Sequence, residues 1–217
     1  MSFPIVVLIS GSGSNLQALI DQSLQGKLNV TISAVISNKA DAYGLERARK
    51  AGIPTHVLDH KSFANREAFD QSLQETIDQY TPKLVVLAGF MRILTDTFTR
   101  HYDGRMLNIH PSLLPKHKGL DTHQRAIDAN DKEHGVSVHF VSAELDAGSV
   151  IVQARTLIEA TDTADSLADK IHKLEHIIYP LSIKWFSEGR LTVQNGKALL
   201  DNQPLLPSGV EYKEVLQ

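Results

Sequence analysis

The residues Ile5-Val-Val-Leu-Ile9 run directly into Ser10-Gly-Ser-Gly-Ser-Asn15, and this junction indicates the fold. A continuous apolar run of this length is typical of a central parallel strand that is covered on both faces. Leu16, Leu19 and Ile20 follow at helical spacing. A strand, a glycine-rich turn and a helix together present backbone N–H groups and a positive dipole end, which suits a phosphate.

The glycine-rich turn indicates a monophosphate site and not a dinucleotide site. The dinucleotide fingerprint needs a third glycine at position 16, where this chain has Leu16. The next predicted strand, 30–37, ends in Asn38-Lys39, with no acidic residue to hold a ribose. Because Gly-Ser-Gly alone is a weak signal, a plain tight turn remains the alternative.

The alternation of strand-like and helix-like segments predicts an α/β fold, a doubly wound, mainly parallel sheet with helices on both faces. Residues 135–141 alternate apolar and polar side chains, so this strand is expected to be half exposed. Asn195-Gly196 between two short apolar runs predicts a terminal hairpin. The other predicted elements are strands over 55–58, 84–88, 108–110 and 150–154, and helices that begin near residues 16, 45, 65, 123 and 163.

Composition limits the classes of function. With 217 residues and 42% hydrophobic content, the chain is expected to form one globular domain. Its net charge of −3 predicts no binding to nucleic acid or to a membrane surface. The absence of cysteine excludes disulfides and thiolate chemistry. The first residues lack a basic region, and their apolar run is too short to span a bilayer, so a cytoplasmic protein is expected.

A second stretch, Arg105-Met-Leu-Asn108-Ile-His110-Pro111, predicts a short buried strand that stops after His110, because proline cannot donate to a strand ladder. Asn108 and His110 are two residues apart, so their side chains leave the strand on the same face. An amide donor beside a proton donor suits a reaction that builds negative charge on a carbonyl oxygen. A histidine and an asparagine that only complete a turn are the alternative.

Asp146, in Glu144-Leu-Asp-Ala-Gly148, is the candidate partner of His110. A carboxylate near an imidazole favours its protonated form and keeps it a competent acid. Asp-x-Gly is also a common turn sequence, and the sequence alone does not place Asp146 beside His110.

The segment Gly89-Phe-Met91-Arg-Ile-Leu94 is unusually apolar for a loop. Its apolar side chains either pack into the core or line a pocket for a flat ligand.

Two other functions remain open from the residues. His172-Lys-Leu-Glu175-His176 matches the H-x-x-E-H zinc pattern, but the sequence identifies no third ligand, so no metal is expected. A phosphate-binding module without chemistry is the second alternative, supported only by the turn at Gly13.

Five stretches in one order resemble the phosphoribosylglycinamide formyltransferases, folate-dependent enzymes of purine biosynthesis. The resemblance runs over nearly the whole chain. Methionyl-tRNA formyltransferase and formyltetrahydrofolate deformylase look similar over the fourth stretch, but the first stretch favours the glycinamide enzymes. The stretches are Leu8-Ile-Ser-Gly-Ser-Gly-Ser-Asn-Leu16, Asn38-Lys-Ala-Asp-Ala-Tyr-Gly-Leu45, Leu87-Ala-Gly-Phe-Met-Arg-Ile-Leu94, Asn108-Ile-His-Pro-Ser-Leu-Leu-Pro115, and Glu175-His176 with Tyr179-Pro180.

The resemblance implies transfer of the formyl group of 10-formyltetrahydrofolate to the amine of phosphoribosylglycinamide. His110 is then the general acid, Asn108 an oxyanion donor, and Asp146 the carboxylate that supports His110. It also implies a nucleotide-binding half over 1–100 and a folate-binding and catalytic half over 101–217, in a monomer or homodimer. The implied nucleotide contacts are Gly13, Ser14, Asn15 and Glu175; the implied folate contacts are Arg66, Met91, Arg92, Ile93, Leu94, Asn108, Val141 and Asp146.

Two loops near the predicted site depart from the family pattern. Lys118 and Asp121 stand where proline and histidine are common, and Ser149 stands where proline is common. The three implied catalytic residues are intact.

Overall fold

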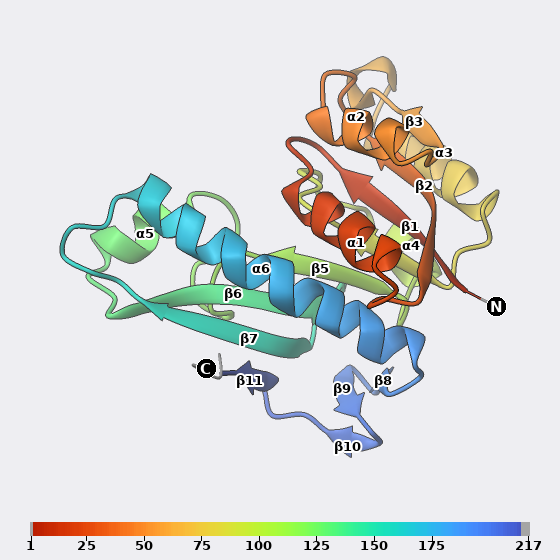
Figure 1. Ribbon diagram of the computed structural model, residues 1–217. Coiled ribbons are helices and arrows are strands. Elements are labelled where there is room, and N and C mark those ends of the chain that lie inside the picture. The colour runs from red at the N-terminus through yellow and green to blue at the C-terminus, as the bar shows by residue number, and fades with distance from the viewer. Residues whose placement is uncertain (1, 214–217) are drawn as a thin grey trace. The chain divides into compact units, whose positions relative to one another are not determined.

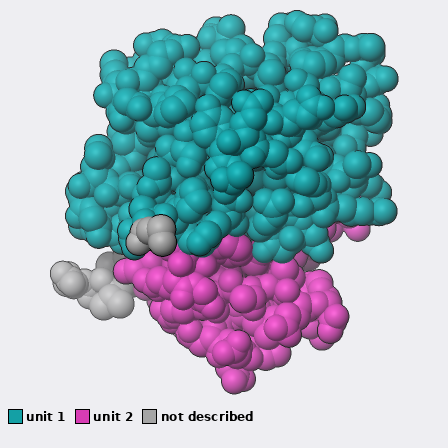
Figure 2. Space-filling model, turned by 90° about the vertical axis from the view of Figure 1, so that its right-hand side faces the viewer, with its two compact units in different colours: residues 1–108 teal, residues 109–217 magenta. Residues whose placement is uncertain are grey.

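The computed structural model describes residues 2–213 and divides the chain into two compact units, residues 1–108 and 109–217. Figure 2 colours the two units separately. The boundary falls within strand β5 (Met106–His110), which carries the predicted catalytic residues.

Unit 1 contains a fully parallel section of sheet with the order β3-β2-β1-β4-β5. Strand β1 lies between β2 and β4, where the direction of chain progression reverses, so the turn after β1 is at a topological switch point. Residues Ile5–Ile9 of β1 are fully buried, which confirms the predicted central strand. The other bounds are β1 (Phe3–Ile9), β2 (Val30–Ser37), β3 (Thr55–Val57) and β4 (Leu84–Leu87).

The helices of unit 1 form two packed pairs, α1 with α2 and α3 with α4. Helix α3 (Arg66–Asp78) begins where the sequence predicts, because the Asn65 side chain accepts a hydrogen bond from the Ala68 N–H at 2.8 Å. Helix α4 (Asp96–His101) was not predicted, since one and a half turns show no clear apolar period. The remaining helices are α1 (Ser14–Leu24), α2 (Tyr43–Lys50) and the 3₁₀ turn η1 (His60–Ser62).

In unit 2, β6 (Glu133–Phe140) and β7 (Val150–Leu157) are antiparallel, and β11 (Val210–Tyr212) pairs with β7 in parallel. The long helix α6 (Ala164–Ser187) lies along β6 and β7 and continues through Pro180 (Figure 1). The predicted hairpin is confirmed as β8 (Leu191–Gln194) and β9 (Lys197–Leu200), to which the short β10 (Gln203–Pro204) adds. Helix α5 (Thr122–Asp128) completes the unit.

The expected half exposure of the β6 strand is wrong. Seven of its eight residues, His134–Phe140, are buried. Helix α6 packs against the strand, and the loop after β5 reaches it too, because the position of a Gly135 Cβ lies only 2.5 Å from the Leu113 side chain. Polar residues such as Ser137 are therefore buried where they bond to that loop.

Within residues 2–213, no helix has the length and apolar character needed to cross a membrane.

Candidate functional site

Strand β5 ends at His110, as Pro111 predicts. Asn108 is half buried and His110 is buried, and the pleat sends both side chains to the same side of the strand.

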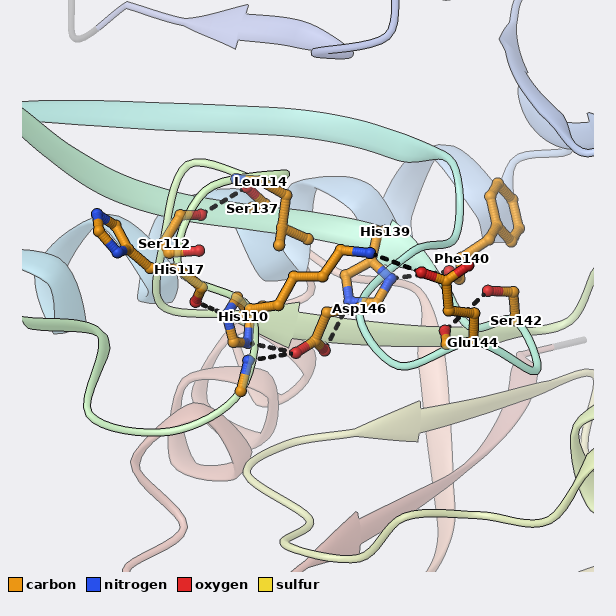
Figure 3. A network of polar contacts seen from close by, with 12 residues as sticks. His110, Ser112, Leu114, His117, Ser137, His139, Phe140, Ser142, Glu144 and Asp146 are labelled. Atoms are coloured by element: carbon orange, nitrogen blue, oxygen red, sulfur yellow. Dashed lines mark hydrogen bonds and ion pairs between the residues drawn. The ribbon is translucent and has the colours of Figure 1, made fainter. Parts of the chain in front are cut away.

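His110 and Asp146 face each other in unit 2 (Figure 3). Nδ1 of His110 lies 3.5 Å from Oδ2 of Asp146. The same carboxylate oxygen accepts a hydrogen bond from the Gly119 N–H at 2.9 Å. Oδ1 of Asp146 lies 3.8 Å from Nε2 of His139, a buried residue whose Nδ1–H donates to the Phe140 carbonyl at 2.8 Å. Burial lowers the pKa of His139, so this second imidazole beside Asp146 is neutral at neutral pH.

The other ring nitrogen of His110 is also held. Nε2 lies 2.9 Å from the backbone carbonyl oxygen of His117. Because a carbonyl oxygen only accepts, Nε2 carries a hydrogen, and the neutral ring therefore presents Nδ1 as its basic atom. The proton that can be exchanged is consequently the one on the Nδ1 edge, beside Asp146.

A tight turn places Asp146. Its φ of 49° is left-handed, a conformation that aspartate tolerates better than most residues. Gly148 lies so close to strand β6 that a Cβ at this position would meet the Phe140 carbonyl oxygen at 1.7 Å. The turn therefore needs glycine two residues after the carboxylate, which the Asp-x-Gly sequence supplies.

Two buried polar residues that the sequence analysis missed hold the loop after β5. Ser137 and Gln153 are partners across β6 and β7. Ser137 Oγ donates to the Ser112 carbonyl at 2.6 Å and accepts from the Leu114 N–H at 3.0 Å, and Gln153 Nε2 donates to the Leu114 carbonyl at 2.8 Å. The alternation Gly135-x-Ser137-x-His139 puts these three residues on one face of β6, which is the signal that could have found Ser137; no comparable signal marks Gln153 on β7.

The glycine-rich turn of unit 1 packs directly on the start of α2. Gly13 has a φ of 71°, and a Cβ there would lie 2.6 Å from the Cα of Gly44. Arg47 of α2 donates through Nε to the Ser12 carbonyl at 2.8 Å. Gly13 is the N-cap residue of α1 and has no side chain to cap the helix. The first turn therefore presents the backbone N–H groups of Ser14 and Asn15 at the helix N-terminus.

The apolar side chains of the loop 89–94 do not all pack into the core. Phe90 and Leu94 are each 8% exposed and belong to the core, whereas Met91 and Ile93 are 60% and 56% exposed. The loop is tied to the end of β1 because the Met91 N–H donates to Ser10 Oγ at 2.8 Å.

The two arginines implied as folate contacts, Arg66 and Arg92, have a common acidic neighbour. Asp70 is buried and accepts a hydrogen bond from the Thr95 N–H at 2.6 Å. Burial raises the pKa of Asp70, while Thr95 and the charges of Arg66 and Arg92 partly oppose that shift.

The residues of the H-x-x-E-H pattern differ in their exposure. Glu175 is buried in α6, His176 is half buried and His172 is exposed. In the part of the chain that the structure describes, no group of three or more His, Cys, Asp or Glu side chains is placed to hold a metal ion. Val141, implied as a folate contact, lies half buried just after β6.

The departures from the family pattern make contacts of their own. Lys118 Nζ pairs with Glu144 at 3.0 Å, which joins the loop after β5 to the turn that carries Asp146. Asp121 is the N-cap residue of α5, with a φ of 56°. Ser149 Oγ accepts a hydrogen bond from the Ala198 N–H of β9 at 2.8 Å.

Comparison with known proteins identifies the family. A family model described as formyl transferase matches residues 4–183. The phosphoribosylglycinamide formyltransferase of Escherichia coli (strain K12) is 57% identical over 210 residues, which cover 97% of this chain and 99% of that protein. The chain belongs to the phosphoribosylglycinamide formyltransferase family.

Further members of the family are similar to this chain in sequence and in structure. The Haemophilus influenzae enzyme is 48% identical over 205 residues, covering 94% of this chain and 97% of that protein. The structure of the Coxiella burnetii phosphoribosylglycinamide formyltransferase aligns with a TM-score of 0.94 at 55% identity and covers 98% of this chain and all of the other. The predicted doubly wound, mainly parallel α/β fold is therefore confirmed as the Rossmann-like fold of the formyltransferases, and the resemblance drawn from the motifs is confirmed too.

Proposed function

We propose that this formyltransferase moves the formyl group of 10-formyltetrahydrofolate to the amine of phosphoribosylglycinamide, in purine biosynthesis, with His110 and Asp146 as its acid–base pair. The observation that carries the roles of these two residues is their buried pairing, with Nδ1 of His110 3.5 Å from Oδ2 of Asp146. Membership of the family supports the reaction and its substrates.

The reaction is a direct transfer between two nitrogens. The glycinamide nitrogen attacks the formyl carbon, a C–N bond forms, and the carbonyl electron pair moves onto oxygen. The bond from that carbon to N10 of the folate then breaks as the carbonyl re-forms. The attacking amine loses one proton and N10 gains one, so the exchange needs a group that both gives and takes a proton.

His110 serves as that group through Nδ1. With its Nε2–H held by the His117 carbonyl, the ring gains or loses only the Nδ1 proton without reorienting. Asp146 offsets the charge of the imidazolium and is itself fixed by the Gly119 N–H. Asn108, on the same face of β5, donates its amide hydrogens to the oxyanion of the tetrahedral intermediate.

The remaining predicted contacts hold the two substrates. The N–H groups at the start of α1, with Gly13, Ser14 and Asn15, bind the nucleotide phosphate, and Glu175 contacts the glycinamide end. The exposed Met91 and Ile93 offer apolar surface to the pterin. Arg66 and Arg92 contact the folate as cations, Leu94 supports its loop from the core, and Val141 is a further folate contact.

The test follows tetrahydrofolate release from 10-formyltetrahydrofolate, with and without phosphoribosylglycinamide, each with and without a chelator. Release that requires the nucleotide and is insensitive to the chelator supports the proposal. Release without the nucleotide identifies a deformylase instead. No release in any arm contradicts the proposed reaction and leaves phosphate binding as the function to examine.

A nucleotide-binding half over 1–100 and a folate-binding and catalytic half over 101–217 belong to the same proposal. The proposed exceptions are Glu175, which contacts the nucleotide substrate, and Arg66 with the loop 89–94, which contact folate. A cytoplasmic location and a monomeric or homodimeric state also belong to the same proposal. Light scattering of the purified protein measures the mass in solution and decides between one and two chains.

A further inference from the structure

The loop between β5 and α5 touches the Nε2 edge of His110 at one backbone atom, the carbonyl oxygen of His117, at 2.9 Å. His117 has a φ of 52°, in the left-handed region that few residues other than glycine adopt. Such a backbone geometry persists only where other contacts hold it. The contacts of the His117 side chain therefore bear on the orientation of His110.

The His117 side chain is 14% exposed and its Nε2 lies 2.8 Å from Oδ2 of Asp131. Asp131 is anchored to the end of α5, because its N–H donates to the Ala126 carbonyl at 3.1 Å. Hydrogen bonds from Lys116 and His117 lower the pKa of the Asp131 carboxyl, so it is ionised at neutral pH. A fixed carboxylate thus holds the ring of His117 through its Nε2.

Lys116 is the second partner of the same carboxylate, with Nζ 2.8 Å from Oδ1 of Asp131. Its side chain is 63% exposed, so this ion pair is screened by water and contributes little. The half-buried histidine contact is the stronger of the two restraints. Lys116 consequently offers a matched control for any change at Asp131.

His134 is another neighbour of His117, and it carries no charge at neutral pH. The His134 ring centroid lies 6.5 Å from that of His117, and burial lowers the pKa of His134 to about 4. The cavity that His117 helps to line also has charged side chains, those of Lys116, Asp131, Lys132, Glu133 and Arg155.

We infer that His117 and Asp131 are positioning residues for His110. The Asp131 carboxylate holds the His117 side chain, and the His117 carbonyl then holds the Nε2–H of His110, which leaves Nδ1 facing Asp146. This inference rests on the proposed role of His110 as the acid–base residue. Without the restraint, the neutral imidazole populates both tautomers, and only one of them presents a basic Nδ1 to the reaction.

Removal of the restraint leaves the rest of the loop in place. Ser112 Oγ donates to the Lys116 carbonyl at 2.6 Å, and Leu114 is held on β6 by Ser137. An Asp131 variant is therefore expected to fold and to loosen only the part of the loop around His117.

The experiment compares Asp131→Ala, Asp131→Asn and the control Lys116→Ala in the full chain. Two quantities are measured: kcat with KM for each substrate, and the ¹⁵N spectrum of the His110 ring at a pH where it is neutral. Asp131→Ala is expected to lower kcat roughly three- to tenfold, the effect of about one hydrogen bond, with KM nearly unchanged. Its His110 spectrum shows both tautomers, whereas the wild type shows Nε2–H alone.

Asp131→Asn keeps an oxygen that accepts from His117, so it is expected to recover most of the wild-type kcat and the single tautomer. Lys116→Ala is expected to match the wild type in both measurements. If Asp131→Ala does not fold, His117→Asn replaces it, because asparagine tolerates the left-handed backbone but is too short to keep the same contact.

A single Nε2–H tautomer in Asp131→Ala overturns the inference, whether or not kcat falls, because any loss is then structural. A wild-type kcat in that variant overturns it as well. The tautomer is read without substrate, so failure of the proposed formyl transfer in the wild type is a separate and distinguishable result.

Discussion

Nδ1 of His110 lies 3.5 Å from Oδ2 of Asp146, and the two side chains are only 7% and 6% exposed. Because water is largely excluded from both side chains, the carboxylate attracts a positive charge on the imidazole more strongly than it would in bulk water. The pair is therefore expected to act as one unit, in which the carboxylate makes the imidazolium available as an acid.

Replacement of Asp146 by asparagine removes the charge of this unit while it keeps an oxygen for the Gly119 N–H. We expect Asp146→Asn to lower kcat about a hundredfold or more, the range of general acid–base catalysis, with little effect on the thermal midpoint. Asp169→Asn removes the same charge from an exposed position on α6 and serves as the control. Near-wild-type turnover in well-folded Asp146→Asn excludes the proposed role of the carboxylate.

Asn108 is proposed to stabilise the oxyanion, so its removal affects the transition state more than the bound substrates. Asn108→Ala is expected to reduce kcat on the order of a hundredfold, with a much smaller change in KM. Steady-state kinetics with each substrate varied in turn measure both. A rise in KM at constant kcat assigns Asn108 to substrate binding instead.

Gly13 and Gly11 give a matched pair in the glycine-rich turn. Alanine at Gly13 meets the Cα of Gly44 at 2.6 Å and must adopt a φ of 71°, whereas at Gly11 a Cβ meets no atom within 4 Å. We expect Gly13→Ala to lower the free energy of unfolding by more than about 1 kcal/mol and to raise the KM for the nucleotide. Gly11→Ala is expected to change stability by less than about 0.5 kcal/mol. Equal stabilities in denaturant titrations disprove the predicted steric conflict.

The sequence predicts the strands and the long helices well because the hydrophobic pattern of each is visible within its own residues. Ile5–Ile9 is apolar throughout, and α6 repeats apolar residues at helical spacing. The sequence does not predict α4 or β11, which are short and depend on tertiary contacts. The predicted exposure of β6 is wrong, because alternating apolar and polar residues do not show which other elements pack against a strand.

The predicted catalytic residues come from local motifs, and only the structure brings His110 and Asp146 together. Their supports were not predicted. Ser137 and Gln153 act through backbone groups of the loop after β5, and Asp131 acts through the side chain of His117. Such contacts between residues distant in sequence leave no local motif. The Gly13–Gly44 approach likewise becomes visible only when two turns are packed together.

The stability of the protein is expected to fall in mild acid because of His134. Burial lowers the pKa of this histidine from 6.5 to about 4. Above pH 6.5 it is neutral in both states; between pH 6.5 and 4 the unfolded chain takes up a proton that the folded chain refuses, so stability is lost as the pH falls. Between pH 7.5 and 5, His134→Gln should reduce the loss by about 1–2 kcal/mol in urea titrations. Some loss of stability is expected to remain in this variant, because burial also lowers the pKa of His139. If His134→Gln loses as much free energy of unfolding between pH 7.5 and 5 as the wild type does, the prediction is contradicted.

The central claim is that His110 supplies and removes the proton during formyl transfer. Its most direct test is a single-turnover measurement of formyl transfer to phosphoribosylglycinamide by His110→Ala, with both substrates bound and the fold checked by circular dichroism. If His110 is the acid–base residue, this rate is expected to be on the order of a hundred to ten thousand times below that of the wild type. A rate close to the wild type in a well-folded variant would contradict it and remove His110 from the chemistry.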